Sequence, residues 1–142
     1  MMSSMNIKLK CFYTDGGQNP NIGQVFQRRK IIEGDSKQME RYQRYLANTL
    51  SLIAPTIDDC DFVLCCIDKV ESGTEAEFEV EGTDVDWVIN ASGVQININI
   101  NDDWVDQPEG KFELNEVKVA VNGWKSFLCM SEAFDSIVEV EL

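Results

Sequence analysis

Residues 75–101 have the sequence EAEFEVEGTDVDWVINASGVQINININ, and the alternation of side chains in this stretch largely decides the fold. Glutamates alternate with small or apolar residues over 75–81, and aliphatic residues alternate with amides over 94–101. A period of two is the pattern of a strand that buries one face. Residues 85–90 and 94–101 flank Ala91-Ser92-Gly93, a three-residue turn ending in glycine that suits a hairpin. The stretch therefore predicts three successive strands.

Further strands are predicted outside this stretch. Residues 6–13 and 137–142 alternate in the same way, and 61–68 enclose FVLCCI, an unbroken apolar run of strand length. Such a run is typical of a central strand covered on both faces. The segment 14–23 (TDGGQNPNIG) is rich in turn residues and is predicted to be a loop. Residues 25–32 fit either a strand or a short helix.

Two long helices are predicted. The first begins at Asp35 or Ser36, which are good N-cap residues, and runs to about Ile53, because Pro55 follows. The second covers residues 113–130. Apolar residues recur at three- and four-residue steps in both, which is the pattern of a helix with one buried face. In the first helix these are Met39, Tyr42, Leu46, Leu50 and Ile53, and in the second Leu114, Val117, Val121, Trp124 and Leu128.

The order of these elements predicts an α+β fold, with a single mostly antiparallel sheet of five to six strands and two main helices packed on it. The chain has 142 residues. That length is typical of one domain, so residues 1–142 are expected to form a single domain. A chain of this size buries about 70% of its unfolded surface and needs no metal or disulfide to hold it together.

Charge is distributed unevenly along the chain. Residues 1–46 hold eight of the 12 basic residues and four of the 25 acidic ones, a local charge of +4, whereas residues 47–142 hold the remaining four and 21, a charge of −17. The two sum to the net charge of −13. Such a surface repels nucleic acid and anionic lipid and attracts basic proteins. The chain also has no histidine, the side chain used most often for proton transfer near neutral pH.

The first candidate binding surface is the row of glutamates in the strand predicted at 75–81. Strand geometry places Glu75, Glu77, Glu79 and Glu81 on one face, with neighbours about 6.6–6.8 Å apart along the strand. Like charges at this spacing repel one another unless cations oppose them. The cations are either those of a basic partner or bases of the same chain, such as Lys8, Lys10 or a helix arginine.

The second candidate combines tryptophans with acids at the open end of the predicted hairpin. An aromatic anchor surrounded by carboxylates is a composition found at binding hot spots for basic proteins. The alternative is that both tryptophans belong to the core. The residues are Asp84, Asp86 and Trp87 in one cluster and Asp102, Asp103, Trp104 and Asp106 in the other.

Motifs for catalysis, metal binding and cofactors are lacking. The aspartates at 58, 59 and 61, like those at 102, 103 and 106, do not have the spacing of a calcium loop. The chain has no CxxC pair and no Gly-x-Ser-x-Gly, and without histidine it has poor means to hold zinc. We therefore expect no enzyme activity and no cofactor.

The cysteines and the N-terminus indicate the compartment. The five cysteines are odd in number, and three of them lie in apolar runs, so they are predicted to be buried and reduced. The N-terminus has no charged region followed by an apolar one, and the chain has no run of about 18 apolar residues. These features predict a cytoplasmic protein that neither enters nor crosses a membrane. The cysteines are Cys11, Cys60, Cys65, Cys66 and Cys129.

The segment VNGWKSFLCM at 121–130, followed by EAFDS at 132–136 and a short final strand, resembles the ends of small bacterial immunity proteins. These are the antidotes of polymorphic and contact-dependent toxin systems. The resemblance implies a non-enzymatic protein that binds the C-terminal domain of a toxin, often a basic nuclease, in the cytosol. It assigns no particular binding residues.

Taken together, the charge and the resemblance predict an acidic inhibitor of a basic toxin domain. The acids are expected to form one face, with Lys8, Lys10, Arg41 and Arg44 lying away from it. One alternative is a small-ligand-binding or enzymatic α+β domain, which requires an apolar pocket with a few polar groups. The other is a phage-type accessory or structural protein whose acids are scattered for solubility. The sequence leaves the oligomeric state open.

Overall fold

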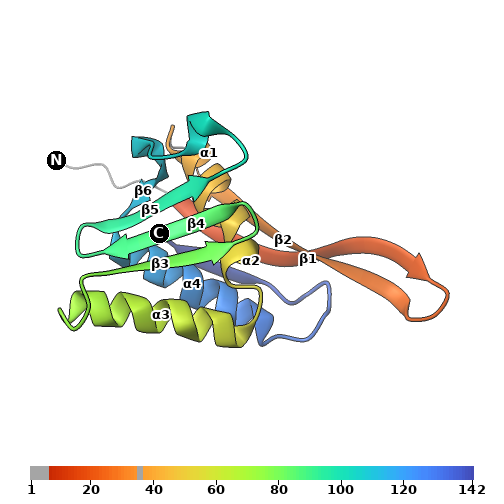
Figure 1. The fold of residues 1–142 in the computed structure, drawn as a ribbon. Coiled ribbons are helices and arrows are strands. Elements are labelled where there is room, and N and C mark those ends of the chain that lie inside the picture. Colours follow the sequence, from red (N-terminus) through yellow and green to blue (C-terminus); the bar gives the residue numbers. More distant parts are fainter. Residues whose placement is uncertain (1–6, 35–36) are drawn as a thin grey trace.

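The computed structural model describes residues 7–34 and 37–142, which form two antiparallel sheets and three main helices (Figure 1). The α+β class is confirmed, but the predicted single sheet of five to six strands with two main helices is wrong. The three-stranded sheet has the order β2-β1-β7, and the four-stranded sheet has the order β3-β4-β5-β6. The strands are β1 (Ile7–Asn19), β2 (Gly23–Gly34), β3 (Glu77–Gly82), β4 (Val85–Asn90), β5 (Gly93–Ile98), β6 (Lys111–Phe112) and β7 (Val138–Glu141).

The strand predicted at 61–68 is instead part of a helix, α3 (Ile57–Glu71). Its buried residues, Cys60, Val63, Cys66, Ile67 and Val70, recur at helical spacing, and Phe62 on the other side is exposed. The helix begins at Thr56, whose hydroxyl accepts a hydrogen bond from the backbone N–H of Asp59 at 3.1 Å. Over residues 7–34 and 37–142, no strand belongs to both sheets, and α3 lies between β2 and β3 in the sequence.

The N-terminal strands form a hairpin that extends away from the rest of the molecule (Figure 1). The predicted loop at 14–23 is wrong, because β1 and β2 stay paired to Asn19 and Gly23. A bulge between Asp15 and Gln18 accommodates the glycines. One carboxylate oxygen of Asp15 accepts hydrogen bonds from the Gly17 N–H and the Gln24 side chain, both at 2.7 Å, which holds the bulge in place. Residues 25–32, left open by the sequence, are strand.

Two predicted helices are confirmed. The first is one continuous helical segment made of α1 (Met39–Arg41), the π-helical turn η1 (Tyr42–Ala47) and α2 (Asn48–Ile53). Its predicted caps, Asp35 and Ser36, lie outside the described residues. The second is α4 (Leu114–Leu128), which starts with a capping box between Glu113 and Glu116.

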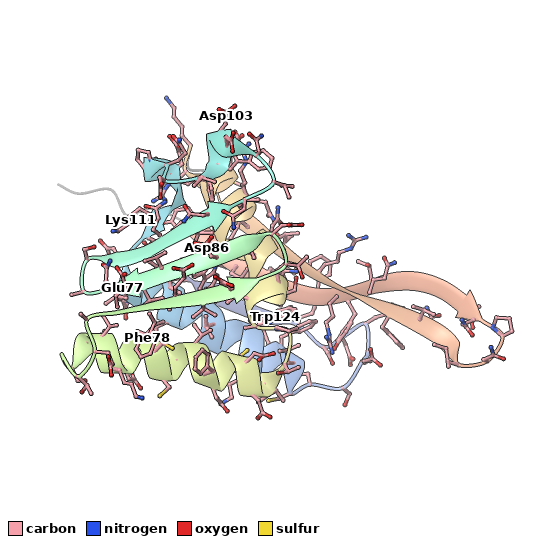
Figure 2. The ribbon with its side chains drawn as sticks, viewed as in Figure 1. Glu77, Phe78, Asp86, Asp103, Lys111 and Trp124 are labelled. Carbon is pink, nitrogen blue, oxygen red and sulfur yellow. The ribbon has the colours of Figure 1, made fainter. Side chains whose placement is uncertain are left out.

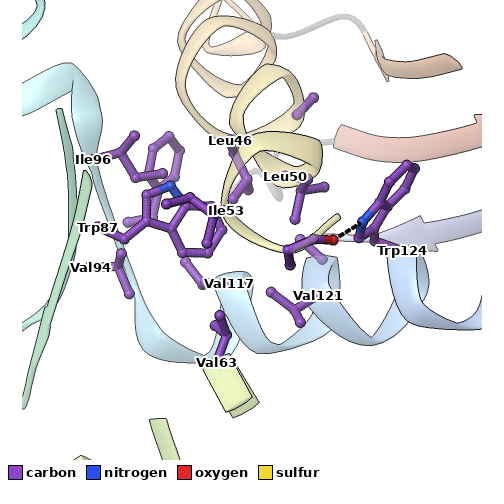
Figure 3. Packing of buried hydrophobic residues seen from close by; sticks show 14 of the residues in the cluster. Leu46, Leu50, Ile53, Val63, Trp87, Val94, Ile96, Val117, Val121 and Trp124 are labelled. Carbon is purple, nitrogen blue, oxygen red and sulfur yellow. Dashed lines mark hydrogen bonds between the residues drawn. The ribbon is translucent and has the colours of Figure 1, made fainter. Parts of the chain in front are cut away.

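The buried residues form one continuous cluster, in which the helices connect the two sheets. Helix α3 contacts β3, β4 and α4, and α4 also contacts β1 and β7. Figure 3 shows Leu46, Leu50 and Ile53 of the first helical segment between two buried tryptophans, Trp87 and Trp124. The indole N–H of Trp124 donates to the carbonyl oxygen of Ala54 at 2.8 Å, so this large side chain is buried without an unpaired polar atom.

The hairpin between β4 and β5 is tighter than predicted. Asn90 pairs directly with Gly93, so the turn has two residues, Ala91 and Ser92. Gly93 has a φ of 135°, and a Cβ at this position would lie 2.4 Å from the carbonyl oxygen of Phe112. Glycine is therefore required because β6 passes so close to this end of the hairpin.

The cysteines are all free, as expected, but they are not all buried. Cys11, Cys60 and Cys66 are buried, whereas Cys65 and Cys129 are exposed. Cys65 and Cys66 differ because they lie on adjacent positions of α3 rather than on the strand predicted there. Among the described residues, the structure contains no helix of the length and apolar character needed to cross a membrane.

Candidate protein-binding surface

The row of glutamates lies on the open face of the four-stranded sheet. In β3, Glu77, Glu79 and Glu81 are exposed, and Val80 between them is buried against the core. Glu75 precedes the strand and is also exposed. The register places Asp86 of β4 directly opposite Glu81, which extends the row to the next strand (Figure 2).

No base of the described part of the chain pairs with these glutamates; the ion pairs there involve other acids, namely Glu40, Asp61, Glu71 and Glu139. The glutamates repel each other and Asp86 instead. The pKa of Glu79 is raised, first by the Asp86 carboxylate, then by partial desolvation, and further by the neighbouring carboxylates of Glu81 and Glu77. A cation that approaches this face would relieve that repulsion.

The two acidic clusters predicted at the hairpin end do lie together, and Asn97 of the hairpin segment connects them. Asn97 donates to one carboxylate oxygen of Asp86 at 3.0 Å and accepts from the Asp106 backbone N–H at 2.8 Å. Asn99 donates to the other oxygen of Asp86 at 2.8 Å, and its backbone N–H donates to the Asp84 carbonyl, also at 2.8 Å. These hydrogen bonds tie the segment at 102–106 to the end of β4 and β5.

The two tryptophans of these clusters differ in environment. Trp87 has 0% exposed surface, so of the two alternatives it occupies the core position (Figure 3). Its indole N–H donates to the hydroxyl of Thr49 at 3.0 Å, and this hydroxyl donates to the Tyr45 carbonyl at 2.5 Å. Because none of its surface is exposed, Trp87 cannot contact a partner in this structure.

Trp104, in the short helix η2 (Asp102–Trp104), is half-buried. The guanidinium carbon of Arg44 lies 5.0 Å from the centre of a Trp104 ring, and Arg44 also pairs with Glu40 at 2.8 Å. The expectation that Arg44 lies away from the acidic clusters is therefore wrong. Arg41 is held elsewhere, donating to the carbonyl oxygens of Glu109 and Lys111, both at 3.1 Å.

A pocket of about 440 Å³ lies beside Trp104, between the first helical segment and the ends of β4 and β5. Its size is within the range of ligand sites. Leu52, Val85, Ile98 and Trp104 supply its apolar surface, and Thr49, which holds Trp87, forms part of its wall. The remaining lining residues are Glu40, Gln43, Arg44 and Asn48.

The sequence did not predict this pocket, because its lining comes from four separate segments: the first helical segment, β4, β5 and η2. The sequence places Leu52 in the first predicted helix, and Val85 and Ile98 in two predicted strands, without indicating that they meet. One local signal was present: an apolar residue on a helix, outside its buried stripe. Leu52 is such a residue, and its exposed fraction is 45%.

No metal centre is found among the described residues, where no three acids or cysteines are grouped closely enough to hold an ion. The aspartates at the start of α3 have other contacts: Asp59 accepts from the Thr56 hydroxyl at 2.7 Å, and Asp61 pairs with Lys125 at 2.6 Å. Comparisons with protein-family models, curated proteins and solved structures gave no match.

Proposed function

We propose that this protein is a non-enzymatic inhibitor that binds a basic protein through the acids on the open face of the four-stranded sheet and at the end of the β4–β5 hairpin. The basic protein is a toxin domain, and a nuclease fits best. A nuclease carries a cationic surface because it must hold phosphates. An acidic protein seated there is attracted at long range and blocks the substrate path.

The observation that carries the proposal is the unpaired row on β3. Glu77, Glu79 and Glu81 are exposed, and the Asp86 carboxylate raises the pKa of Glu79. Among the described residues, Asn90 is the only one outside the row whose side chain hydrogen-bonds to these three acids, and it donates to Glu77 at 3.2 Å. In the isolated protein no ion pair among the described residues offsets the repulsion between these acids. Contact with a basic surface would offset that repulsion.

The function can be tested with the C-terminal domain of the toxin-like protein encoded next to this chain, if such a gene is present. We expect the two purified proteins to form a complex and the nuclease activity of the domain to be lost. Raising the ionic strength from about 0.05 to 0.5 M shortens the Debye length from about 14 to 4 Å. This change should slow association far more than it speeds dissociation.

A charge-matched pair of variants separates this surface from net charge. Both variants remove three negative charges from exposed positions. The first should slow association by tenfold or more at low salt, and the second should leave it nearly unchanged. Equal rates for the two variants would contradict the proposed surface. The first is Glu77→Gln, Glu79→Gln, Glu81→Gln, and the second is Asp68→Asn, Glu132→Gln, Asp135→Asn.

A further inference from the structure

We propose that the pocket beside Trp104 receives a large apolar side chain, such as Leu, Met or Phe, carried by a basic segment of the partner. This inference rests on the proposed function and names the contact that anchors the complex. The acids bring the partner to the surface, and the pocket holds one of its side chains there. The two contributions are separable by experiment.

The interior of the pocket favours an apolar occupant. Leu52, Val85, Ile98 and Trp104 come from four different elements and converge on the same space of about 440 Å³. Val85 and Ile98 are directly paired across β4 and β5, so their side chains stand on the same face of the sheet. Leu52 keeps 45% of its surface exposed, and an apolar side chain in the pocket would cover it.

The charges around the pocket favour a basic carrier for that side chain. Glu40 is one of its lining residues, Asp84 directly precedes Val85, and Asp102 and Asp103 directly precede Trp104. All four of these acids are exposed. The one base in the lining, Arg44, pairs with Glu40 at 2.8 Å, so these two charges cancel. Asp84, Asp102 and Asp103 then give the surroundings of the pocket their net negative charge. Lysines or arginines beside the inserted residue would therefore be attracted, and an anionic ligand would be repelled.

The walls of the pocket are held in place before any partner arrives. Asn97 accepts from the Asp106 N–H at 2.8 Å, which fixes the segment that carries Trp104. On the opposite side, a Cβ at Gly82 would lie 2.4 Å from the carbonyl oxygen of Leu52, so β3 and α2 are in close contact there. A preformed pocket loses little conformational entropy when it is filled, which favours binding.

The test uses three capped peptides, Lys-Lys-X-Lys-Lys with X as Leu, Phe or Gly, titrated into the ¹⁵N-labelled protein. The reporter is the indole N–H resonance of Trp104. The indole of Trp124 donates to the carbonyl oxygen of Ala54, and neither residue lines the pocket, so its resonance should stay in place. We expect the Leu and Phe peptides to shift the Trp104 resonance and to bind roughly 10-fold to 100-fold more tightly than the Gly peptide, from the gain in apolar burial.

Two variants and one control assign this preference to the pocket. Trp104→Ala and Leu52→Ala should remove the advantage of the Leu and Phe peptides without weakening the Gly peptide. The control, Phe62→Ala, removes an exposed aromatic side chain from α3, outside the pocket, and should retain the full advantage. Thermal melting of each variant checks that the fold is intact.

Other results would overturn the inference. Equal affinity for all three peptides, with no shift of the Trp104 resonance, would mean that the pocket is not an anchor. If that binding is still salt-sensitive, the proposed function is not contradicted. Equally tight binding of Glu-Glu-Leu-Glu-Glu would show that the acids do not select a basic carrier. A shift of Trp104 by neutral indole, with no competition from any peptide, would identify a small-molecule site instead. Binding of the peptides that ignores salt would count against the proposed function and not against the pocket.

Discussion

Replacing Thr49 with Val tests whether the buried indole of Trp87 is held in the core through its N–H. The Trp87 N–H donates to the Thr49 hydroxyl at 3.0 Å, and both side chains are buried, with exposed fractions of 0% and 2%. Valine has nearly the shape of threonine but cannot accept a hydrogen bond. In the variant the indole N–H is therefore left without this partner at a position where both side chains are almost fully buried.

The expected cost follows from that unpaired group. A buried donor that loses its only partner destabilises a protein by about 1–3 kcal/mol. The entropy of unfolding is about 2.1 cal/mol/K per residue, or about 0.3 kcal/mol/K over the 142 residues. A loss of about 2 kcal/mol then lowers the melting temperature by about 7 °C. Thr49→Ser, which keeps the hydroxyl, should retain the hydrogen bond and lose only the packing of one methyl group.

The assay is a double-mutant cycle by urea denaturation, with Thr49→Val, Trp87→Phe and the double variant. Trp87→Phe removes the donor, so Thr49→Val should cost less in that background than in the wild type. We expect a coupling free energy of about 1 kcal/mol or more. A coupling near zero, together with a melting temperature for Thr49→Val within a degree of the wild type, would refute the argument that this hydrogen bond holds Trp87 in the core.

Three further predictions concern stability, charge and thiol reactivity. Gly93→Ala should destabilise the fold by about 1–3 kcal/mol in urea melts, because its φ is 135° and the Phe112 carbonyl leaves no room for a Cβ. Glu79→Gln should raise the free energy of unfolding at pH 7 but not at pH 3. The raised pKa of Glu79 means that its ionised form is disfavoured in the folded state, so this group lowers stability as the pH rises through its titration and has no such effect once protonated. A thiol reagent at pH 8 should modify Cys65 and Cys129 first, because burial raises the pKa of the other three thiols; modification of all five at one rate in the folded protein would contradict their burial.

Residues 57–71 form helix α3, although the sequence predicts a strand over 61–68. The run from Phe62 to Ile67 is apolar throughout, so it has no period that separates a strand from a helix. The local signal for a helix was Thr56, because a threonine three residues before an acid is typical of a helix N-terminus. A strand at this position gives the predicted fold one helix too few, because α3 is the third main helix.

The amino-acid pattern alone was sufficient to predict the secondary structure wherever one side of an element is buried and the other is exposed to solvent. Side chains alternate with a period of two in a strand and of about 3.6 in a helix, and residues 75–101, the first helical segment and α4 follow these periods. Strand β3, the β4–β5 hairpin and both helices were therefore predictable. The same alternation predicts that β3 exposes the row of glutamates. The charge asymmetry is likewise a property of composition. Only the tertiary structure decided that Trp87 is buried against Thr49 and that Arg44 lies over the ring of Trp104. It also decided that a pocket forms where Trp104 meets Leu52, Val85 and Ile98. The physical reason is that burial depends on contacts between residues far apart in the chain, and the periodicity of a single segment carries no information about which other segment packs against it.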